Sequence, residues 1–344
     1  MKIKQLTIQN YKSIKELKIV DPAPFSAFIG ANGVGKSNIF EAVEFLAIAW
    51  NVRRDTAIEL FGGWDTISNK KLKRNYSIEI SLDTYPAPSE DILTSVGVGY
   101  GMRFLKPGSN LLHESHSETS NKVAEVNEDP TGYFSKTALG FDSSRIFVGQ
   151  IDKVKLNIDS SHQLKLDGSN LEKVLKRLLL IESIKDEMFE WLSLFIPEFE
   201  KLEVYSDNIS GRDTLQLTMK GYKDPFGRNL ISDGTYNILC LLTAVYQSDK
   251  PQFLCIEEPE NGLNPYVVRQ LVQFFRSQCE EKGHYIWVNT HSQTLVSQLK
   301  ASEVILVDKK DGFTEIKQLK DNDLHGLPLD EAWLTNALGG GLPW

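Results

Sequence analysis

The sequence predicts an α/β fold with a mixed central sheet, flanking helices, an N-terminal antiparallel β part and a helical insert. One observation that predicts it is a glycine-rich loop between a short apolar run and a helical pattern near the start of the chain. A second is a pair of apolar runs late in the chain, separated by one amphipathic helix. Such an order favours parallel strands, because a parallel pair needs a long crossover connection.

The first elements are two strands and a helix. The chain opens with an alternating strand that turns around Asn10 to Ser13. The apolar residues from Phe25 to Ile29 indicate a short buried strand, and apolar residues recur with helical spacing from Ile39 to Ala47.

The loop between this strand and this helix runs from Gly30 to Ser37 and satisfies G-x-x-x-x-G-K-[ST] in full. Glycines in such a loop allow backbone N–H groups to close around phosphates, at the N-terminus of a helix. Lys36 can reach the β- and γ-phosphates, and the Ser37 hydroxyl can ligate Mg²⁺. The loop therefore predicts a nucleoside triphosphate site.

A long insert follows the helix. Tyr76 to Leu82 and Val98 to Leu105 are expected to be strands, and Pro107 to Gly132 is expected to be a mobile polar loop. Leu171 to Phe195 is expected to be helical and to form a lid or a lobe on which a partner docks. The insert holds no long heptad array of the kind that forms a coiled coil.

The first late apolar run, Phe253 to Ile256, leads into Glu257 and Glu258 and then a Pro-, Gly- and Asn-rich turn. A parallel strand delivers carboxylates at its C-terminal end, where they can serve a bound nucleotide. We expect Glu257 to hold the Mg²⁺ shell and Glu258 to orient the attacking water. The alternative is a buried strand with a solvated acidic tip.

The second late run, His284 to Ser292, ends in a polar cluster that contains His291. His291 could donate to a γ-phosphate, with an ordinary surface histidine as the alternative. Upstream, Ser232, Asp233 and Gly234 open another apolar helical pattern, which by itself indicates only a helix N-cap.

The order of these four segments resembles that of the stand-alone ABC-type ATPase heads related to RecF, SMC heads and the OLD (overcoming lysogenisation defect) family, including ATPase subunits of anti-phage systems such as PARIS and Septu. The opening strand also looks like the one that begins those heads. The resemblance covers nearly the whole chain and implies an ABC-type P-loop NTPase head over residues 1–344. Within it we expect a β-rich insert with a mobile loop at 51–150, a helical lobe at 151–204, and a signature, Walker B and switch half with a C-terminal tail at 205–344.

The resemblance also implies roles for individual residues. Glu258 matches the catalytic glutamate, Glu257 the Mg²⁺ position and His291 the switch histidine. Ser232 and Gly234 match the signature motif, which in such heads completes the site of a second subunit, so that ATP is sandwiched between two protomers. Gln150 is either a Q-loop residue that senses Mg²⁺ or a plain surface glutamine, and the sequence favours neither. The nucleotide-binding positions are Gly30, Asn32, Gly33, Gly35, Lys36, Ser37 and Asn38.

Three departures from the family pattern matter. Glu257 replaces the more usual Asp, so Mg²⁺ is expected to be held through water. Asp233 and Thr235 replace the Gly and Gln of transporter-type signatures, which sets the chain apart from transporters. Asn264 stands where related ATPases often have His.

Composition indicates an ordinary globular protein. The chain has 344 residues, of which 41% are hydrophobic and 24% charged. No run approaches the roughly 18 apolar residues that span a bilayer, so we expect a cytoplasmic location without a membrane partner. Cys240, Cys255 and Cys279 are too few and too scattered for a disulfide framework, and Cys279 is expected nearer the surface.

The net charge of −8 argues against a surface that binds nucleic acid throughout, but basic residues cluster locally. If DNA lies across the top of an ATP-bound dimer, as in related heads, they are candidate phosphate contacts; a solvated loop is the alternative. The main cluster is Lys70, Lys71, Lys73 and Arg74, and a second group is Lys12, Lys15 and Lys18.

Other chemistry is not expected. His113 and His116 lack a second ligand pair for a metal. Asp321 and Asp323 are too near the end of the chain to belong to a Toprim nuclease of the OLD type. The glycine-rich tail from Leu338 to Trp344 is either a docking segment or a frayed terminus.

Three functional hypotheses follow. The preferred one is an ATPase that dimerises around ATP and Mg²⁺ and controls a separately encoded effector, possibly a nuclease, in defence against foreign DNA. The second is a RecF-like DNA-repair ATPase, and the third is a non-hydrolysing nucleotide-binding scaffold, which Glu258 opposes. The chain has no Asn-Lys-x-Asp sequence of the kind that recognises guanine, which disfavours a GTPase.

Overall fold

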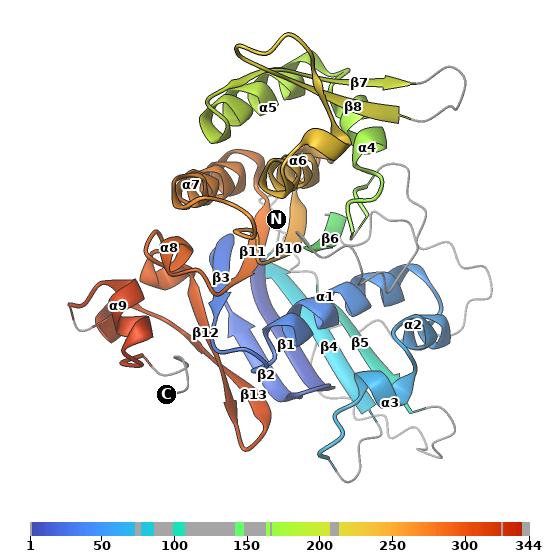
Figure 1. Cartoon of the computed structure of the whole chain (residues 1–344). Coiled ribbons are helices and arrows are strands. Elements are labelled where there is room, and N and C mark those ends of the chain that lie inside the picture. Colours follow the sequence, from blue (N-terminus) through green and yellow to red (C-terminus); the bar gives the residue numbers. More distant parts are fainter. Residues whose placement is uncertain are drawn as a thin grey trace, which may run out of the picture. The chain divides into compact units, whose positions relative to one another are not determined.

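Figure 1 shows a computed structural model of the whole chain. The structure describes residues 2–72, 77–85, 99–106, 142–147, 163–165, 167–206, 213–324 and 326–338. The chain divides into two compact units. Unit 1 comprises Met1–Ser143 and Lys300–Trp344, and unit 2 comprises Ser144–Leu299.

Unit 1 begins with a four-stranded antiparallel sheet in the order β2-β1-β4-β5. This is the predicted N-terminal β part, and both strands predicted in the insert belong to it. Along β4 buried and half-buried residues alternate strictly, as expected for a sheet with one face against the core. The strands are β1 (Lys2–Tyr11), β2 (Ile14–Val20), β4 (Ser77–Tyr85) and β5 (Gly99–Leu105).

Helix α1 (Lys36–Asn51) lies across one face of this sheet (Figure 1). Phe45 on α1 packs its ring against Tyr11 and Phe104, with centroid distances of 5.8 and 4.6 Å. The Tyr11 hydroxyl donates to the buried Glu41 carboxylate at 3.0 Å. The helix that follows the glycine-rich loop is therefore held by the antiparallel sheet.

Unit 1 also holds a mixed group of strands. β3 (Phe25–Ile29) pairs in parallel with β12 (Val304–Lys310), and β12 pairs antiparallel with β13 (Phe313–Gln318). All five residues of β3 are buried, which is typical of a parallel strand covered on both faces. The predicted strand before the loop is therefore confirmed.

Unit 2 contains the predicted crossover. β10 (Gln252–Glu257) and β11 (Tyr285–Thr290) pair in parallel, and α7 (Pro265–Lys282) connects them. Asn264 caps α7 by accepting a hydrogen bond from the Val267 N–H at 3.0 Å. The helix ends at Gly283, whose left-handed conformation suits a C-cap.

The helices expected in the insert are α4 (Leu171–Leu178) and α5 (Glu182–Phe195), and both belong to unit 2. The antiparallel sheet after them, in the order β7-β8-β9, was not predicted. A register shift between Phe199 and Lys201 breaks the alternation of β7, which weakens the period-two signal. Its strands are β7 (Phe199–Ser206), β8 (Asp213–Met219) and β9 (Phe226–Gly227).

Cys279 is buried on the inward face of α7, so the expectation that it lies nearer the surface was wrong. In the residues that the structure describes, no helix is long and apolar enough to cross a membrane. The remaining elements are α2 (Arg54–Leu60), α3 (Trp64–Ile67), β6 (Asp142–Phe147), η1 (Arg228–Leu230), α6 (Asp233–Tyr246), α8 (Gln293–Val296), η2 (Ala301–Glu303), η3 (Asp321–Leu324) and α9 (Leu329–Leu334).

Several predictions of the sequence lie outside the described residues. They concern Pro107 to Gly132, Gln150, the pair His113 and His116, Lys73, Arg74 and the tail from Gly339 to Trp344.

Candidate functional site

The glycine-rich loop of unit 1 joins β3 to α1, as its motif requires. Gly35 is the N-cap of α1, with a φ of 109°, and no side chain caps the helix. The N-terminus of a helix without a side-chain cap presents backbone N–H groups and a partial positive charge to an anion. The local structure therefore suits a phosphate group.

The side chains of Ser13 and Thr314, which the motif did not predict as site residues, hold the loop in place. The Asn38 side chain donates to Ser13 Oγ at 2.7 Å, and Ser13 Oγ lies 2.6 Å from Thr314 Oγ1. Thr314 Oγ1 donates in turn to the Val34 carbonyl at 2.7 Å. A Cβ at Gly35 would overlap Thr314 Oγ1 and lie 2.6 Å from Ser13 Oγ. Gly35 is therefore required both by its conformation and by this close approach.

Lys36 is buried, and its ammonium group donates to the carbonyl oxygens of Gly30 and Ala31 at 2.8 and 2.9 Å. Lys309, on β12, donates to the Gly33 carbonyl at 3.2 Å and was not predicted as a site residue. Gly33 has a φ of +76° and open space where a Cβ would stand. Buried positive charge, a glycine-lined cradle and a helix N-terminus together fit a polyphosphate.

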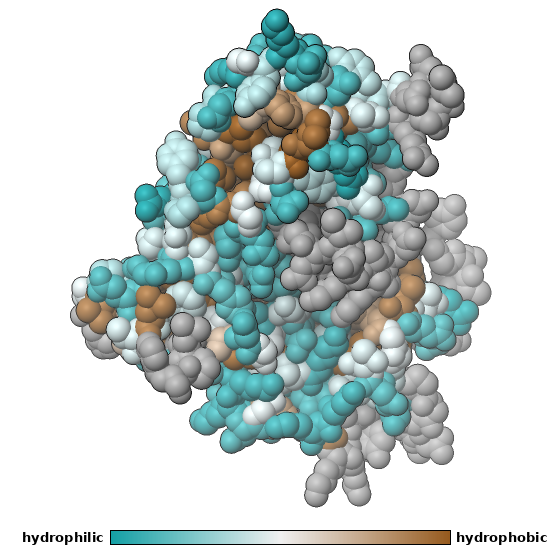
Figure 2. All heavy atoms as spheres, viewed as in Figure 1, coloured by the Kyte–Doolittle hydropathy of each residue, from teal (hydrophilic) through white to brown (hydrophobic). Residues whose placement is uncertain are grey.

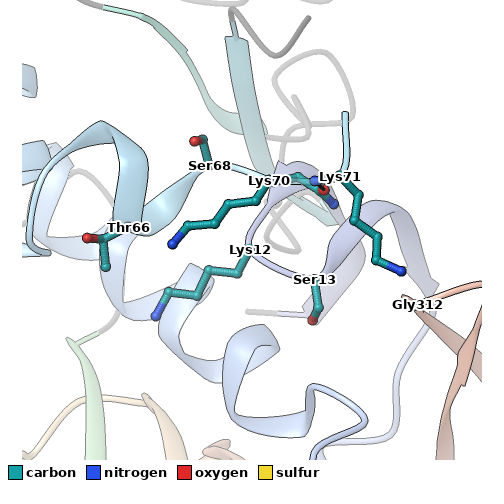
Figure 3. A pocket seen from close by; sticks show the side chains of 8 residues that line it. Lys12, Ser13, Thr66, Ser68, Lys70, Lys71 and Gly312 are labelled. Carbon is teal, nitrogen blue, oxygen red and sulfur yellow. Dashed lines mark hydrogen bonds between the residues drawn. The ribbon is translucent and has the colours of Figure 1, made fainter. Parts of the chain in front are cut away.

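A pocket of about 220 Å³ lies beside this loop in unit 1 (Figure 3). Ser13 belongs to both the pocket and the contacts of the loop. Lys12 and Lys70 extend toward the same side of the pocket, near Thr66, and Lys71 extends toward Gly312. The lining residues are Lys12, Ser13, Thr66, Ser68, Asn69, Lys70, Lys71 and Gly312.

The lysines of the two predicted basic groups differ in their surroundings. Lys12 forms an ion pair with Glu41, and Lys71 donates to the Asp311 carbonyl at 3.0 Å. Lys15 lies over the Phe313 ring at 5.9 Å, and Lys18 lies 3.8 Å from Glu16. Lys12, Lys70 and Lys71 are thus the basic residues that the structure gathers around one cavity.

In unit 2, Glu257 is the last residue of β10 and is buried. The parallel register places Asn289 of β11 beside it, and the Asn289 side-chain amide donates to the Glu257 carboxylate. The Asn289 side-chain oxygen and carbonyl oxygen both accept from the Glu258 N–H, each at 3.0 Å. Asn289 therefore orients one carboxylate and the backbone of the next, a role that sequence analysis missed.

Glu258 adopts a left-handed backbone conformation with a φ of 47°, which a residue with a long side chain rarely adopts. Such a conformation costs about 1 kcal/mol and persists where the surroundings enforce it. Asn261 supplies a further restraint, because its side-chain amide donates to the Glu258 carboxylate at 2.9 Å. The turn after β10 therefore fixes the direction of the predicted catalytic carboxylate.

His291 follows the end of β11. Its backbone N–H donates to Glu260 Oε1 at 3.2 Å, and the Thr290 hydroxyl donates to the same oxygen at 2.5 Å. The structure thus brings the predicted switch histidine into contact with the turn that carries Glu258. Glu260 was not predicted as a site residue.

The predicted signature segment begins α6. Ser232 caps this helix, with its hydroxyl accepting from the Thr235 N–H at 3.2 Å, which confirms the predicted N-cap. A Cβ at Gly234 would overlap the Gly262 carbonyl oxygen, so glycine is required there by a close approach to the turn after β10. The exposed side chain of Ser232 is accessible to another molecule.

Unit 1 therefore gathers the predicted phosphate-binding residues, and unit 2 gathers Glu257, Glu258, His291 and the signature segment. A glycine-rich loop between a strand and a helix, two carboxylates at a strand end and the predicted signature at a helix start are the features expected of an ATPase domain of the AAA/ABC type. A family model described as "AAA domain, putative AbiEii toxin, Type IV TA system" matches residues 25–297, and the chain belongs to this family.

Similar proteins agree with this class. RecF of Carboxydothermus hydrogenoformans, a DNA replication and repair protein, is 25% identical over 97% of this chain and 94% of its own length. An ATP/GTP phosphatase of Helicobacter pylori is 21% identical over 95% of this chain and 94% of its own length.

Solved structures show the same fold. The head of an Smc protein bound to the C-winged helix domain of ScpA has a TM-score of 0.62 and 17% identity, covering 95% of this chain and all of that one. The Smc head with an extended coiled coil from Pyrococcus furiosus has a TM-score of 0.57 and 16% identity, covering 94% of this chain and 98% of that one. The predicted ABC-type α/β fold is confirmed.

Proposed function

We propose that the chain binds and hydrolyses ATP as an ABC-type ATPase that dimerises around the nucleotide and controls a separately encoded effector. Two observations carry this proposal, one in each unit: a complete glycine-rich loop around Lys36 in unit 1, and in unit 2 a strand end at which Asn289 orients Glu257 and Glu258. Hydrogen bonds hold both Lys36 in the loop and Glu258 after the strand, which opposes the alternative of a non-hydrolysing scaffold.

Each residue has a defined part in this proposal. Lys36 and the N-terminus of α1 stabilise negative charge on the phosphates, and Glu258 orients the attacking water. Ser37 and Glu257 would hold Mg²⁺, which supplies further charge neutralisation at the phosphates when bound. Because Glu257 is one methylene longer than the usual aspartate, we propose that it acts through a metal-bound water.

The dimer is proposed from the signature segment. Ser232 is exposed at the start of α6, where it is accessible to the nucleotide of a second copy. The likeness in fold to Smc heads supports a head that assembles with other chains, because both of those heads are bound to a domain of ScpA. We propose that the dimer controls a separately encoded effector, as ATPases of anti-phage systems in the OLD, PARIS and Septu group do.

Hydrolysis is tested with Glu258→Gln and Lys36→Ala. Lys36→Ala should abolish ATP binding, because it removes the buried ammonium group. Glu258→Gln should keep ATP bound but slow turnover by at least about a hundredfold, measured as phosphate release. Turnover at the wild-type rate in Glu258→Gln would remove this residue from the mechanism.

Dimerisation around ATP is tested by mixing two inactive variants. Ser232→Arg blocks the signature of one copy, and Lys36→Ala blocks the phosphate loop of the other. A heterodimer of the two retains one intact composite site, so the mixture should recover part of the activity. Confirmed heterodimers without any recovery would contradict the sandwich.

A second candidate function, a RecF-like ATPase that acts on DNA, is favoured by one observation: Lys12, Lys70 and Lys71 gather around one cavity of unit 1. The similarity to RecF over nearly the whole chain supports it.

The salt dependence of DNA binding tests this second function. If the lysines contact phosphates, DNA affinity should fall steeply with salt, and the double variant Lys70→Glu, Lys71→Glu should flatten that slope. Lys223→Glu with Lys250→Glu, on exposed positions of unit 2, is the control of equal charge. An identical slope in both double variants would place DNA elsewhere.

A further inference from the structure

A third carboxylate follows the two predicted ones. Glu260 lies two residues after Glu258 in the turn that follows β10. One of its oxygens, Oε1, accepts hydrogen bonds from the Thr290 hydroxyl at 2.5 Å and from the His291 N–H at 3.2 Å. Its other oxygen, Oε2, is buried and has no hydrogen-bond partner among the described residues. The side chain therefore points from the turn to the end of β11.

This arrangement is costly for stability alone. Burial raises the pKa of Glu260, and the nearby Glu258 carboxylate raises it further, against the hydrogen bonds from Thr290 and His291. A buried carboxyl group with one unpaired oxygen destabilises the folded state unless something offsets it. Costly buried groups are concentrated at functional sites, so the contact itself is the feature to explain.

We propose that Glu260 is a positioning residue for hydrolysis, which fixes the segment that carries His291 to the turn that carries Glu258. The contact joins the turn that carries Glu258 to Thr290 and to the backbone of His291 through one oxygen atom of Glu260. Asn289 already fixes the backbone of Glu258 to β11, and Glu260 adds a second link one residue beyond that strand. The two links together hold the first residues of the turn to the end of β11, so that Glu258 and His291 keep a constant relative position. This inference rests on the proposed ATPase function.

The decisive comparison is Glu260→Ala against Glu260→Gln in the full chain. Glutamine keeps an acceptor oxygen for Thr290 and His291, whereas alanine removes it. Glu260→Ala should lower kcat by about tenfold or more, with the KM for ATP within about twofold, because small misplacements of reacting groups are costly. Glu260→Gln should restore kcat to within about threefold of wild type. A kcat in Glu260→Ala equal to that of wild type would overturn the inference.

A double-mutant cycle with His291→Ala separates this inference from the proposed function. Because Glu260 is proposed to keep the His291 side chain at a constant position relative to Glu258, its loss should have no further effect once that side chain is removed, so Glu260→Ala combined with His291→Ala should be no slower than His291→Ala alone. Two effects that multiply independently would overturn the inference. If His291→Ala alone turns over ATP at the wild-type rate, the proposed role of His291 fails. A slow His291→Ala beside an unimpaired Glu260→Ala overturns only the positioning role.

Two further variants guard against loss of folding. Glu303 is also a buried glutamate that accepts from a backbone N–H, at 2.7 Å from Lys300, but in unit 1. Glu303→Ala should lower the unfolding midpoint without changing kcat. Thr290→Val removes the hydroxyl that donates to Glu260, and Thr290→Ser keeps it. If Glu260→Ala does not fold, a slower kcat in Thr290→Val that Thr290→Ser restores supports the inference, and equal rates overturn it.

Discussion

The glycine-rich loop of unit 1 and the strand ends of unit 2 depend to different degrees on close packing and on hydrogen bonds. In the loop, close packing decides which residue is allowed: Gly35 lies against Ser13 and Thr314 with no room for a Cβ. At the strand ends, Asn289, Asn261 and Glu260 hold the turn after β10 by hydrogen bonds. Steric exclusion is all-or-none, whereas a hydrogen bond can be weakened in steps.

Both units expose large apolar side chains, among them Leu60 and Leu105 in unit 1. Figure 2 shows mainly hydrophilic residues over β12 and β13 of unit 1 and hydrophobic residues gathered near α5 and α6 of unit 2. Leu194 of α5 and Leu230 of η1 are 45% and 72% exposed. Unit 2 therefore combines an internal polar network with an exposed apolar side chain, Leu230, two residues before the predicted signature residue Ser232.

The largest effect is expected from Gly35→Ala. The added Cβ would overlap Thr314 Oγ1 and force a residue with a side chain into a φ of 109°. ATP affinity, measured by calorimetry, should fall by about a hundredfold or more. Gly221→Ala in unit 2 has a similar φ of +86° but open space around the Cβ, so it should cost only about 1 kcal/mol of stability. If both variants bind ATP alike, packing around Gly35 is not what shapes the loop.

The next effect is expected from Asn289→Asp, which places a carboxylate where Glu257 now receives an amide hydrogen bond. Partners of metal-binding side chains typically contribute about 10- to 100-fold to metal affinity. The Mg²⁺ concentration that half-saturates ATP hydrolysis should therefore rise by about tenfold or more. Gln252→Ala removes a buried amide at the other end of β10 and should reduce stability only. An unchanged Mg²⁺ dependence in Asn289→Asp would remove Asn289 from the site.

The same contrast explains what could be predicted from the sequence. Close approach demands glycines at fixed spacing, so the phosphate loop was predicted from its motif. The strands that end at Glu257 and Thr290 were predicted from apolar runs. Asn289 and Glu260 were not given roles, because their contacts depend on the register between β10 and β11, which apolar periodicity leaves open. Thr314 gave no signal at all, since its contact with the loop joins segments far apart in the chain.

A smaller effect is expected at the signature segment, where Arg228 of η1 braces α6. Its guanidinium group donates to both Glu172 oxygens at 2.9 and 3.2 Å and to the Tyr236 hydroxyl at 2.8 Å. Arg228→Ala leaves Glu172 without this partner and should cost about 2 kcal/mol in urea unfolding. Lys282→Ala breaks the exposed pair with Glu187 and should cost about 0.5 kcal/mol or less. Equal costs for the two variants would show that Arg228 is not a brace.

The smallest effect is expected on the pH dependence of stability. It tests whether a polar side chain also holds the other end of the strands in unit 2. His284 is buried just before β11, and its Nδ1 accepts from the Gln252 N–H at 3.1 Å. Burial lowers the pKa of His284 from 6.5 to about 4. Between these pH values the unfolded chain binds a proton that the folded chain excludes, so stability is intact above pH 6.5 and falls as the pH drops toward 4.

Lowering the pH from 7.5 to 5.5 should therefore reduce the free energy of unfolding by about 1 kcal/mol through His284. His284→Asn replaces it by a neutral acceptor and should remove that part of the pH dependence, measured by urea unfolding at both pH values. If the variant and the wild type lose equal stability, the acid sensitivity of unit 2 arises from other groups.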